Sequence, residues 1–190
     1  MYKIELNNKI IIVGGYCATG KSTFSRKLSQ MLNIPCFNKD IIKEVLGDGI
    51  GPENNTAEKK GSAATFLLML HIAECFLQTG NLCILESNFK LKEIEQIKIL
   101  LEKYNGKCLT FIFKGDFNIL FDRYMKRDVA EKRHWVHNTT GENIDNFRDG
   151  HLQAGIGETG IGKTITIDAT SFDKVNYEEL FTIAKDFIIM

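Results

Sequence analysis

Apolar positions along the chain alternate between two spacings. Short apolar runs rich in β-branched and aromatic side chains are typical of strands buried on both faces of a sheet. Five such runs are present, at residues 9–13, 34–37, 82–86, 108–113 and 164–168. Between the runs, apolar residues recur three or four positions apart, which predicts amphipathic helices. Strands that alternate with helices predict a parallel sheet covered by helices on both faces.

Helices are predicted at residues 21–32, 41–46, 62–78, 91–104, 117–127 and 177–188. Asn33 and Pro35 end the first of them. Asp40 and Asp116 are each placed to cap a following helix, because Asp is a preferred N-cap residue. Residues 47–55 are expected to form a loop.

The segment from Asn138 to Lys163 shows neither spacing and contains six glycines. A segment of that length without its own pattern is typically functional or mobile. No second domain, internal repeat or low-complexity tract is visible. We therefore expect residues 1–190 to form one domain, with a lid and a glycine-rich loop at about 123–163.

Charge and cysteine content restrict the possible partners and compartment. The 24 basic and 24 acidic residues give a formal net charge of zero, so no general field attracts nucleic acid or an anionic membrane. The spacing of the cysteines suits neither a redox pair nor zinc, which favours a reducing cytoplasm; they are Cys17, Cys36, Cys75, Cys83 and Cys108.

The longest apolar stretch is interrupted by His71 and Glu74 after about a dozen residues, and a bilayer core is ~30 Å thick. We expect this stretch to be too short to cross a membrane. Residues 1–8 lack the apolar core of a signal peptide. These features predict a soluble cytoplasmic protein without a membrane partner.

Two segments match the phosphate-loop pattern GxxxxGK(S/T): GYCATGKS at residues 15–22 and GETGIGKT at 157–164. Such a loop works because its backbone N–H groups converge on an anion at a helix N-terminus. The first match lies between a predicted strand and a predicted helix. The second has no helix after it, and neither does the overlapping GxGxxG match at 155–160. The predicted phosphate site therefore comprises Gly15, Tyr16, Cys17, Ala18, Thr19, Gly20, Lys21, Ser22 and Thr23.

Phosphoryl transfer needs charge neutralisation, a bound metal ion and an oriented nucleophile. Lys21 is expected to reach the β- and γ-phosphates of a nucleotide, and Ser22 to bind Mg²⁺. Glu86 ends a strand beside the loop and is a second candidate Mg²⁺ ligand. It could instead pair with Lys21 or cap the following turn. Asp40 follows the second strand and could accept a proton from an acceptor hydroxyl, or act only as a helix cap.

Arg123, Arg127 and Arg133 form an arginine cluster that leads into the irregular segment. Guanidinium groups suit phosphate oxygens at the transition state, so we expect at least one to act from a lid. The alternative is a solvated helix face. His134 and His137 have no accompanying carboxylate motif, so no metal site is expected there.

Cys17 lies inside the phosphate loop, beside its converging N–H groups. These groups could lower the pKa of the thiol, which would make Cys17 a redox brake on the loop. The alternative is a small residue without a special role.

The segments GYCATGKST, NKDIIKEVL, ILESNF and LFDRYMKRDVAEKRH together resemble the small P-loop kinases. They are most similar to AAA-type small-molecule kinases akin to zeta toxin, chloramphenicol phosphotransferase and gluconate kinase. The resemblance covers roughly the first 135 residues and the last strand and helix. Many of these relatives have Asp where this chain has Glu86.

The resemblance implies an α/β protein with the three-layer α/β/α P-loop NTPase fold, a five-stranded parallel sheet in the order 2-3-1-4-5 and a helical lid. It also implies ATP as phosphate donor, Asp40 as general base, and Arg123, Arg127 and Arg133 as lid residues. The predicted function is Mg²⁺-dependent transfer of the γ-phosphate of ATP to a hydroxyl of a small molecule.

The acceptor is predicted to be neutral or cationic, such as a sugar, nucleoside or antibiotic. Residues 41–80 contain no arginine. Nucleoside monophosphate and shikimate kinases use arginines in the corresponding helices to bind an anionic acceptor.

Two other functions fit the same motifs. One is a nucleotide-dependent switch, in which ATP only orders the lid for a protein partner. The other is a toxin-like kinase that acts on a nucleotide sugar. A polynucleotide kinase is disfavoured, because no run of basic and aromatic residues suggests a channel for a strand.

Overall fold

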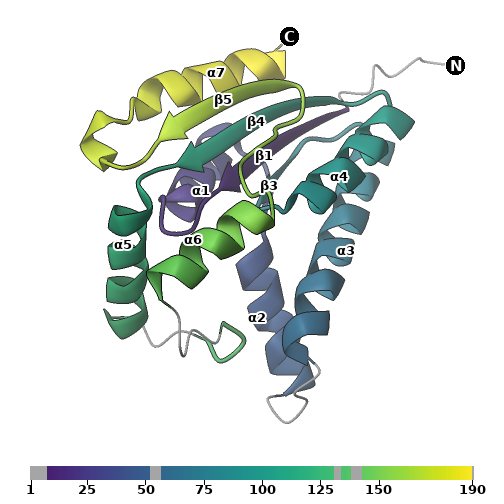
Figure 1. The fold of residues 1–190 in the computed structure, drawn as a ribbon. Coiled ribbons are helices and arrows are strands. Elements are labelled where there is room, and N and C mark those ends of the chain that lie inside the picture. Colours follow the sequence, from purple (N-terminus) through teal and green to yellow (C-terminus); the bar gives the residue numbers. More distant parts are fainter. Residues whose placement is uncertain (1–7, 52–56, 131–133, 138–142, 190) are drawn as a thin grey trace, which may run out of the picture.

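Five parallel strands form the central sheet of the computed structural model, which describes residues 8–51, 57–130, 134–137 and 143–189. The strands are β1 (Lys9–Gly15), β2 (Cys36–Asn38), β3 (Cys83–Glu86), β4 (Lys107–Lys114) and β5 (Lys163–Asp168). Their order across the sheet is β2-β3-β1-β4-β5, as predicted (Figure 1). Val13 in β1 pairs with Glu86 on one side and with Phe111 on the other, so the end of β3 lies beside the end of β1.

Helices cover both faces of the sheet. In the described residues they are α1 (Lys21–Leu32), α2 (Lys39–Ile50), α3 (Ala57–Gln78), α4 (Leu91–Lys103), α5 (Phe117–Ala130), α6 (Ile144–Gln153) and α7 (Tyr177–Ile189). Successive side chains of a strand point to opposite faces. Ile10 and Ile12 therefore pack with α3 and α4, while Ile11 and Val13 pack with α1 and α7. The result is the predicted three-layer α/β/α arrangement.

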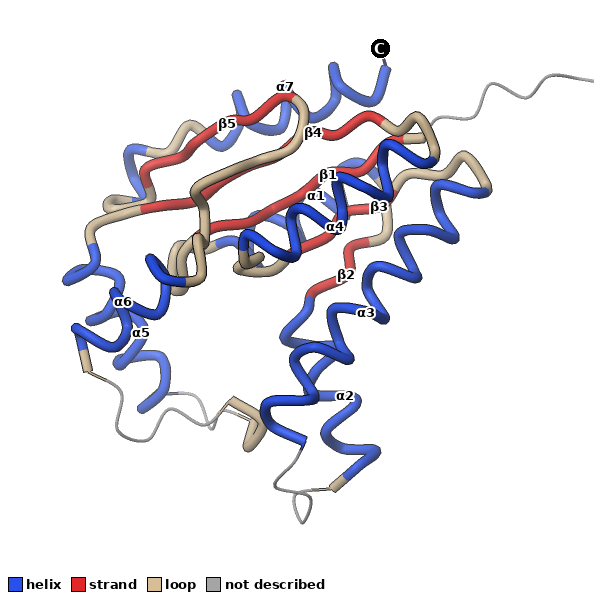
Figure 2. Tube along the Cα trace, turned by 45° about the vertical axis from the view of Figure 1, so that its right-hand side comes forward, coloured by secondary structure: helices blue, strands red, loops and turns tan. Residues whose placement is uncertain are grey.

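A third apolar cluster joins α5 and α6 to the start of the loop after β1. Tyr16 in this loop packs with Leu120 and Tyr124 of α5 and with Phe147 of α6. Figure 2 shows α5 and α6 on one side of this end of the sheet and α2 with α3 on the other. The loop after β1 thus lies at the carboxyl end of the strands, between two helical walls.

The helices differ from the predictions mainly in α6, α2 and α3. Helix α6 lies in the segment that showed no pattern, and Asn143 caps it by accepting a hydrogen bond from the Asn146 N–H. Helix α2 continues through residues 47–50, which were predicted to be loop. Its Gly47 is buried because the residue lies against Val136, whose Cγ1 would be 2.4 Å from an added Cβ atom. Helix α3 begins at Ala57, earlier than predicted.

Residues 154–162, here called the glycine crossing, connect α6 to β5 along the α4 side of the sheet. Ile161 exchanges hydrogen bonds with the Thr110 hydroxyl and packs against the core between the sheet and α3 and α4. Gly162 has a φ of +66°, and a Cβ atom there would lie 2.1 Å from the Cys108 carbonyl oxygen. Because β5 follows directly, the second phosphate-loop match has no helix N-terminus, as expected.

Helix α3 corrects the prediction about the longest apolar stretch. Its stretch Gly61–Gln78 is long and apolar enough to cross a membrane by length and composition alone, because the helix continues past His71 and Glu74. One face of α3 instead packs into the core of the fold, and 28% of the stretch is buried. The buried apolar residues of this face are Phe66, Met69, Ala73 and Leu77.

Candidate functional site

The loop from Gly15 to Gly20 joins β1 to the N-terminus of α1. The Tyr16 N–H donates to the Phe113 carbonyl oxygen at 2.8 Å, which ties the loop to β4. Gly15 has a φ of +117°, and a Cβ atom there would lie 2.0 Å from the same oxygen. No described residue accepts a hydrogen bond from the backbone N–H groups of residues 18–23. These donors at a helix N-terminus suit a bound phosphate.

Lys21 is buried at the base of this loop. Its Nζ donates to the Tyr16 carbonyl oxygen and lies 3.5 Å from the Thr19 hydroxyl. Burial lowers the pKa of Lys21, because removal from water disfavours the charged amine. A phosphate in the loop would favour the ammonium form, so the site fits an anionic ligand.

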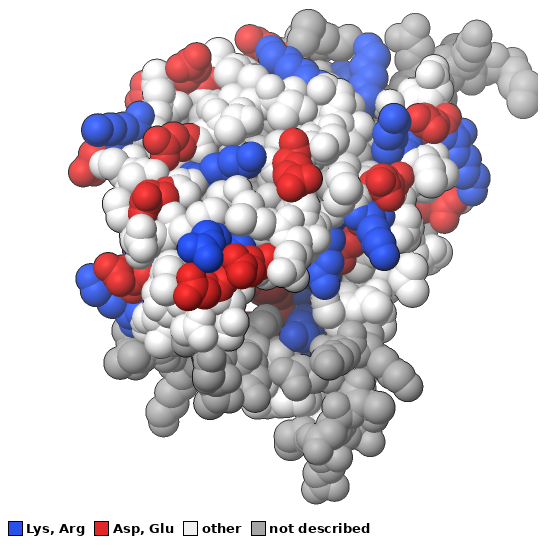
Figure 3. Space-filling model, in the orientation of Figure 1, with Lys and Arg blue, Asp and Glu red and all other residues white. Residues whose placement is uncertain are grey.

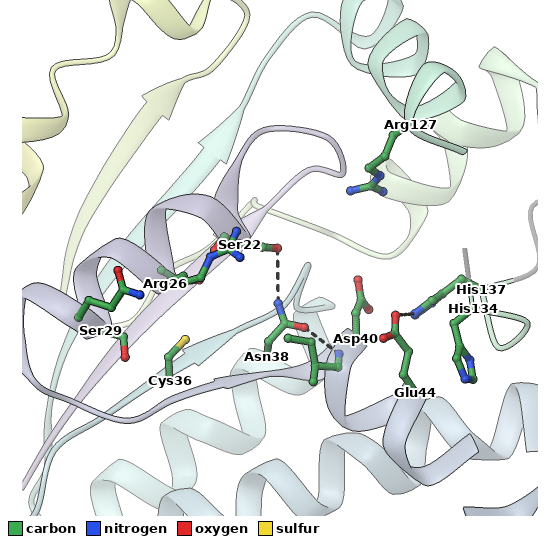
Figure 4. Close-up of a pocket in the computed structure, with 13 residues that line it drawn as sticks. Ser22, Arg26, Ser29, Cys36, Asn38, Asp40, Glu44, Arg127, His134 and His137 are labelled. Atoms are coloured by element: carbon green, nitrogen blue, oxygen red, sulfur yellow. Dashed lines mark hydrogen bonds and ion pairs between the residues drawn. The ribbon is translucent and has the colours of Figure 1, made fainter. Parts of the chain in front are cut away.

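Arg127 on α5 supplies a second cationic group. Its Nε is buried and has no hydrogen-bond acceptor among the described residues. The side chain points into the space between α1 and α2 (Figure 4). A buried guanidinium N–H without an acceptor is rare in proteins. Arg127 is therefore placed to bind an anion beside the loop.

Arg123, one turn earlier on α5, has a different environment. Its two terminal nitrogens donate to the carbonyl oxygens of Ala169 and Thr170, each at 2.7 Å. Its guanidinium also stacks 4.0 Å from the centroid of the Phe172 ring. These contacts fasten the turn after β5 and leave Arg123 outside both cavities described below. Arg133, the third predicted lid arginine, lies outside the described residues.

Glu86, Ser22 and Asn38 meet beside the loop. The Asn38 amide donates to the Glu86 carboxylate and lies 3.4 Å from the Ser22 hydroxyl oxygen. Burial is the main cause that raises the pKa of Glu86, to about 7; Lys21 opposes this rise, and Asp40 adds to it. A nearby cation would favour the ionised carboxylate.

This set of oxygen donors fits Mg²⁺. The ion usually takes one or two protein oxygens and completes its shell with phosphates and waters, as the Ser22 hydroxyl and the Glu86 carboxylate would allow. Among the described residues, no group of three or more His, Cys, Asp or Glu side chains could hold a metal ion by itself. A metal ion at this position would therefore depend on the oxygens of a nucleotide.

Asp40 does not cap α2, contrary to the prediction. The cap is Asn38, whose side-chain oxygen accepts a hydrogen bond from the Ile41 N–H at 2.9 Å. The helix begins at Lys39, so Asp40 lies in its first turn with an exposed side chain. Its carboxylate is thus free of the capping role that was the alternative to a catalytic one.

Two cavities meet at this site. The smaller, of about 120 Å³, is lined by residues of the loop after β1 and by Glu86 and Asn88. The larger, of about 720 Å³, lies between α1, α2 and residues 134–137. Three residues line both cavities: Ser22, Asp40 and Arg127. The Asp40 carboxylate and the Arg127 guanidinium group therefore lie where the smaller cavity meets the larger one. The larger cavity has room for a small molecule.

No protein-family model matches this sequence, and no curated protein is significantly similar to it. Solved structures match nearly its whole length. A proposed kinase from Chloroflexus aurantiacus J-10-fl is 24% identical with a TM-score of 0.80, over 96% of each chain. A gluconokinase from Sinorhizobium meliloti 1021 has a TM-score of 0.58 at 14% identity, over 96% of this chain and 93% of its own. The APS kinase of Mycobacterium tuberculosis has a TM-score of 0.60 at 12% identity, over 97% and 99%. The fold is that of the P-loop kinases.

Several side chains that line the larger cavity were not predicted from the sequence to belong to the site. Helix α1 contributes Ser25, Arg26 and Ser29, which follow Ser22 at helical spacing along one face. This spacing could have been recognised in the sequence. In the lining of the same cavity, His137 pairs with Glu44 at 2.9 Å (Figure 4). No local pattern could have predicted this pair, because 93 positions separate the two residues.

Cys17 does not have the lowered pKa that a redox brake would need. Burial raises the pKa of its thiol, and this effect exceeds the opposing influence of Lys21. The thiol also accepts a hydrogen bond from the Asn88 amide at 2.9 Å. Cys17 is therefore a small, largely uncharged residue of the loop after β1.

Proposed function

We propose that this protein is a Mg²⁺- and ATP-dependent kinase that transfers the γ-phosphoryl group to a hydroxyl of a small molecule without strong negative charge. The observation that carries this proposal is the junction of the two cavities at Ser22, Asp40 and Arg127. A binding switch needs a phosphate cradle but no second cavity with a carboxylate at the junction. A kinase needs both.

The nucleotide would lie with its phosphates in the smaller cavity. The backbone N–H groups of residues 18–23 and the Lys21 ammonium group would neutralise the phosphate oxygens. Mg²⁺, held by Ser22 and Glu86, would supply further charge neutralisation. Arg127 would bind the migrating phosphoryl group with the guanidinium N–H that lacks an acceptor here.

Asp40 would orient the acceptor hydroxyl and take its proton. In the transfer, the acceptor oxygen forms a bond to the γ-phosphorus, the bond from that phosphorus to the bridging oxygen of ADP breaks, and the hydroxyl proton passes to Asp40. The position of Asp40 at the junction supports this role, because the acceptor and the γ-phosphate must meet there.

The charges of the larger cavity favour an acceptor without strong negative charge. Its described lining contains two arginines, Arg26 and Arg127, which are offset by Asp40 and Glu44. Serine hydroxyls on α1 offer hydrogen bonds to a polar acceptor.

Basic and acidic side chains are interspersed over the face drawn in Figure 3. The mixed charge of this face supports a small-molecule partner and no nucleic-acid or membrane partner. The use of ATP supports a cytoplasmic location, where ATP is available.

The first experiment is to incubate the protein with Mg²⁺, γ-labelled ATP and a metabolite extract, and to search for a labelled small molecule by chromatography and mass spectrometry. Lys21→Ala is the control. A labelled product that the control lacks would establish the kinase and identify the acceptor. Tight ATP binding without transfer to any extract would favour the nucleotide-dependent switch instead.

A further inference from the structure

His151 on α6 holds a backbone group of the phosphate loop. The Cys17 N–H donates a hydrogen bond to His151 Nε2 at 3.0 Å, between residues 134 positions apart. His151 is 6% exposed, and its ring packs against Tyr16 at 5.3 Å and Phe147 at 4.5 Å between centroids. A side chain from the glycine-rich region therefore contacts the nucleotide loop directly.

The partners of the ring determine its tautomer. Nδ1 lies 2.6 Å from the carbonyl oxygen of Phe147, which can only accept a hydrogen bond, so Nδ1 carries the proton. Nε2 then has a free lone pair directed at the Cys17 N–H. Burial lowers the pKa of His151, and nearby Lys21 lowers it further, which favours this neutral form.

Helix α6 is fixed to the rest of the fold at two places. Near its C-terminal end, the Leu91 N–H of α4 donates to the Ala154 carbonyl oxygen at 3.0 Å. On its buried face, Phe147 packs against Phe121 and Tyr124 of α5, at 5.5 and 5.2 Å between ring centroids. The imidazole is consequently presented to the loop from a rigid support rather than from a free loop.

The loop has an unfavourable backbone conformation directly after the N–H that His151 accepts. Ala18, next to Cys17, has a φ of +57°, a region that costs a residue with a Cβ atom about 1 kcal/mol or more. Such a conformation persists only when its surroundings enforce it. The Thr19 hydroxyl holds the Tyr16 carbonyl at 2.8 Å, and His151 holds the N–H that comes directly before Ala18.

We propose that His151 is a positioning residue of the phosphate loop, which through its Nε2 acceptor preforms the ring of N–H donors and makes triphosphate affinity depend on the docking of α6. The inference rests on the proposed nucleotide-binding role of the loop. It assigns a function to the region between α5 and β5, for which the sequence supplied none.

Two substitutions separate the hydrogen bond from the packing of the ring. His151→Phe keeps an aromatic ring but removes the acceptor, and it should weaken Mg²⁺·ATP binding about tenfold, the effect of one buried N–H left without an acceptor. His151→Gln offers an amide oxygen to the same N–H and should restore most of the affinity. Leu152→Ala, on the exposed side of α6, is the matched control and should bind like the wild type.

Affinity is measured by titration calorimetry, together with the melting temperature of each ligand-free variant. Wild-type affinity in His151→Phe would overturn the proposal, as would an equal loss in the Phe and Gln variants. In the ligand-free wild type, nitrogen NMR should show an unprotonated Nε2 that is coupled through the hydrogen bond to the Cys17 amide. If this coupling is present but the wild type does not bind ATP, the proposed function itself fails, and the inference with it.

Discussion

The side-chain amide of Asn38 donates a hydrogen bond to the buried carboxylate of Glu86. The oxygen of the same amide caps α2 by accepting from the Ile41 N–H. One residue thereby joins the end of β3 to the start of α2. Since Asp40 lies in the first turn of α2, its position relative to the phosphate loop depends on this connection.

Substitution of Asn38 should separate these two contributions. Asn38→Ser can still cap α2 but cannot reach Glu86, whereas Asn38→Ala loses both contacts. We expect Ala to lower the free energy of unfolding by about 1 kcal/mol more than Ser, which is the typical value of a cap. Urea unfolding measures this difference, and equal stabilities of the two variants would contradict the capping assignment.

Glu86→Gln should change how stability depends on pH. The pKa of Glu86 is about 7 in the folded protein, against an ordinary value of 4.5. Between these values the folded state keeps a proton that the unfolded state has lost, so the free energy of unfolding falls as pH rises. Gln has no such proton. The free energy of unfolding of the wild type should therefore fall by about 2 kcal/mol more than that of the variant between pH 5 and pH 8.

This difference is measured by chemical denaturation at both pH values, without nucleotide or metal ion. A pH-independent difference between the two proteins would contradict the raised pKa. In the transfer assay, the same variant should need a higher Mg²⁺ concentration for half-maximal activity, because it loses a carboxylate ligand.

Asp40→Asn should reduce the rate of transfer by about 10²- to 10⁴-fold, the typical contribution of a general base. Its dissociation constant for ATP should stay close to that of the wild type. Asp48→Asn, an exposed carboxylate on the same helix that pairs with His134, is the control and should retain activity. Near-normal turnover in Asp40→Asn would exclude Asp40 as the base and favour the switch.

Substitution of the two described arginines of α5 should affect different properties of the protein. Arg127→Ala should lower kcat by about 10²- to 10³-fold, as expected for loss of a donor to the transition state. Arg123→Ala should instead lower the free energy of unfolding by about 1–3 kcal/mol, because two carbonyl oxygens lose their donors. Stopped assays at saturating ATP and thermal unfolding of both variants test this. A larger loss of kcat in Arg123→Ala would reverse the assignment.

The strand, loop and helix around GYCATGKS were predictable because each is encoded by neighbouring residues. A buried β-branched run, glycines and an amphipathic helix follow one another without a break. The sheet order followed from the resemblance rather than from the pattern. Helix α6 was missed, although Ile144, Phe147 and His151 have helical spacing, because only Phe147 and His151 are buried and glycines and polar residues surround them.

The parts of the site that could not be predicted depend on distant contacts. The pairs of Cys17 with His151 and of Glu44 with His137 join residues far apart in the sequence. Hydrophobic periodicity reports which side of an element is buried, but it does not report which polar groups meet. Asp40 was located correctly at the carboxyl edge of the sheet, while its capping role was wrong because Asn38, two residues earlier, occupies the cap.

The glycine crossing has a consequence for the interpretation of mutational data. Any side chain at Gly162 would collide with the Cys108 carbonyl group, and one at Gly160 would lie 2.4 Å from the Thr164 hydroxyl oxygen. The Thr164 side chain is exposed and can turn away, whereas the Cys108 backbone cannot. In a saturation mutagenesis screen Gly162 should therefore be as intolerant as Lys21, although it is remote from the chemistry. Its intolerance would reproduce the signature of a second nucleotide motif, when the cause is a backbone that passes too close to a strand.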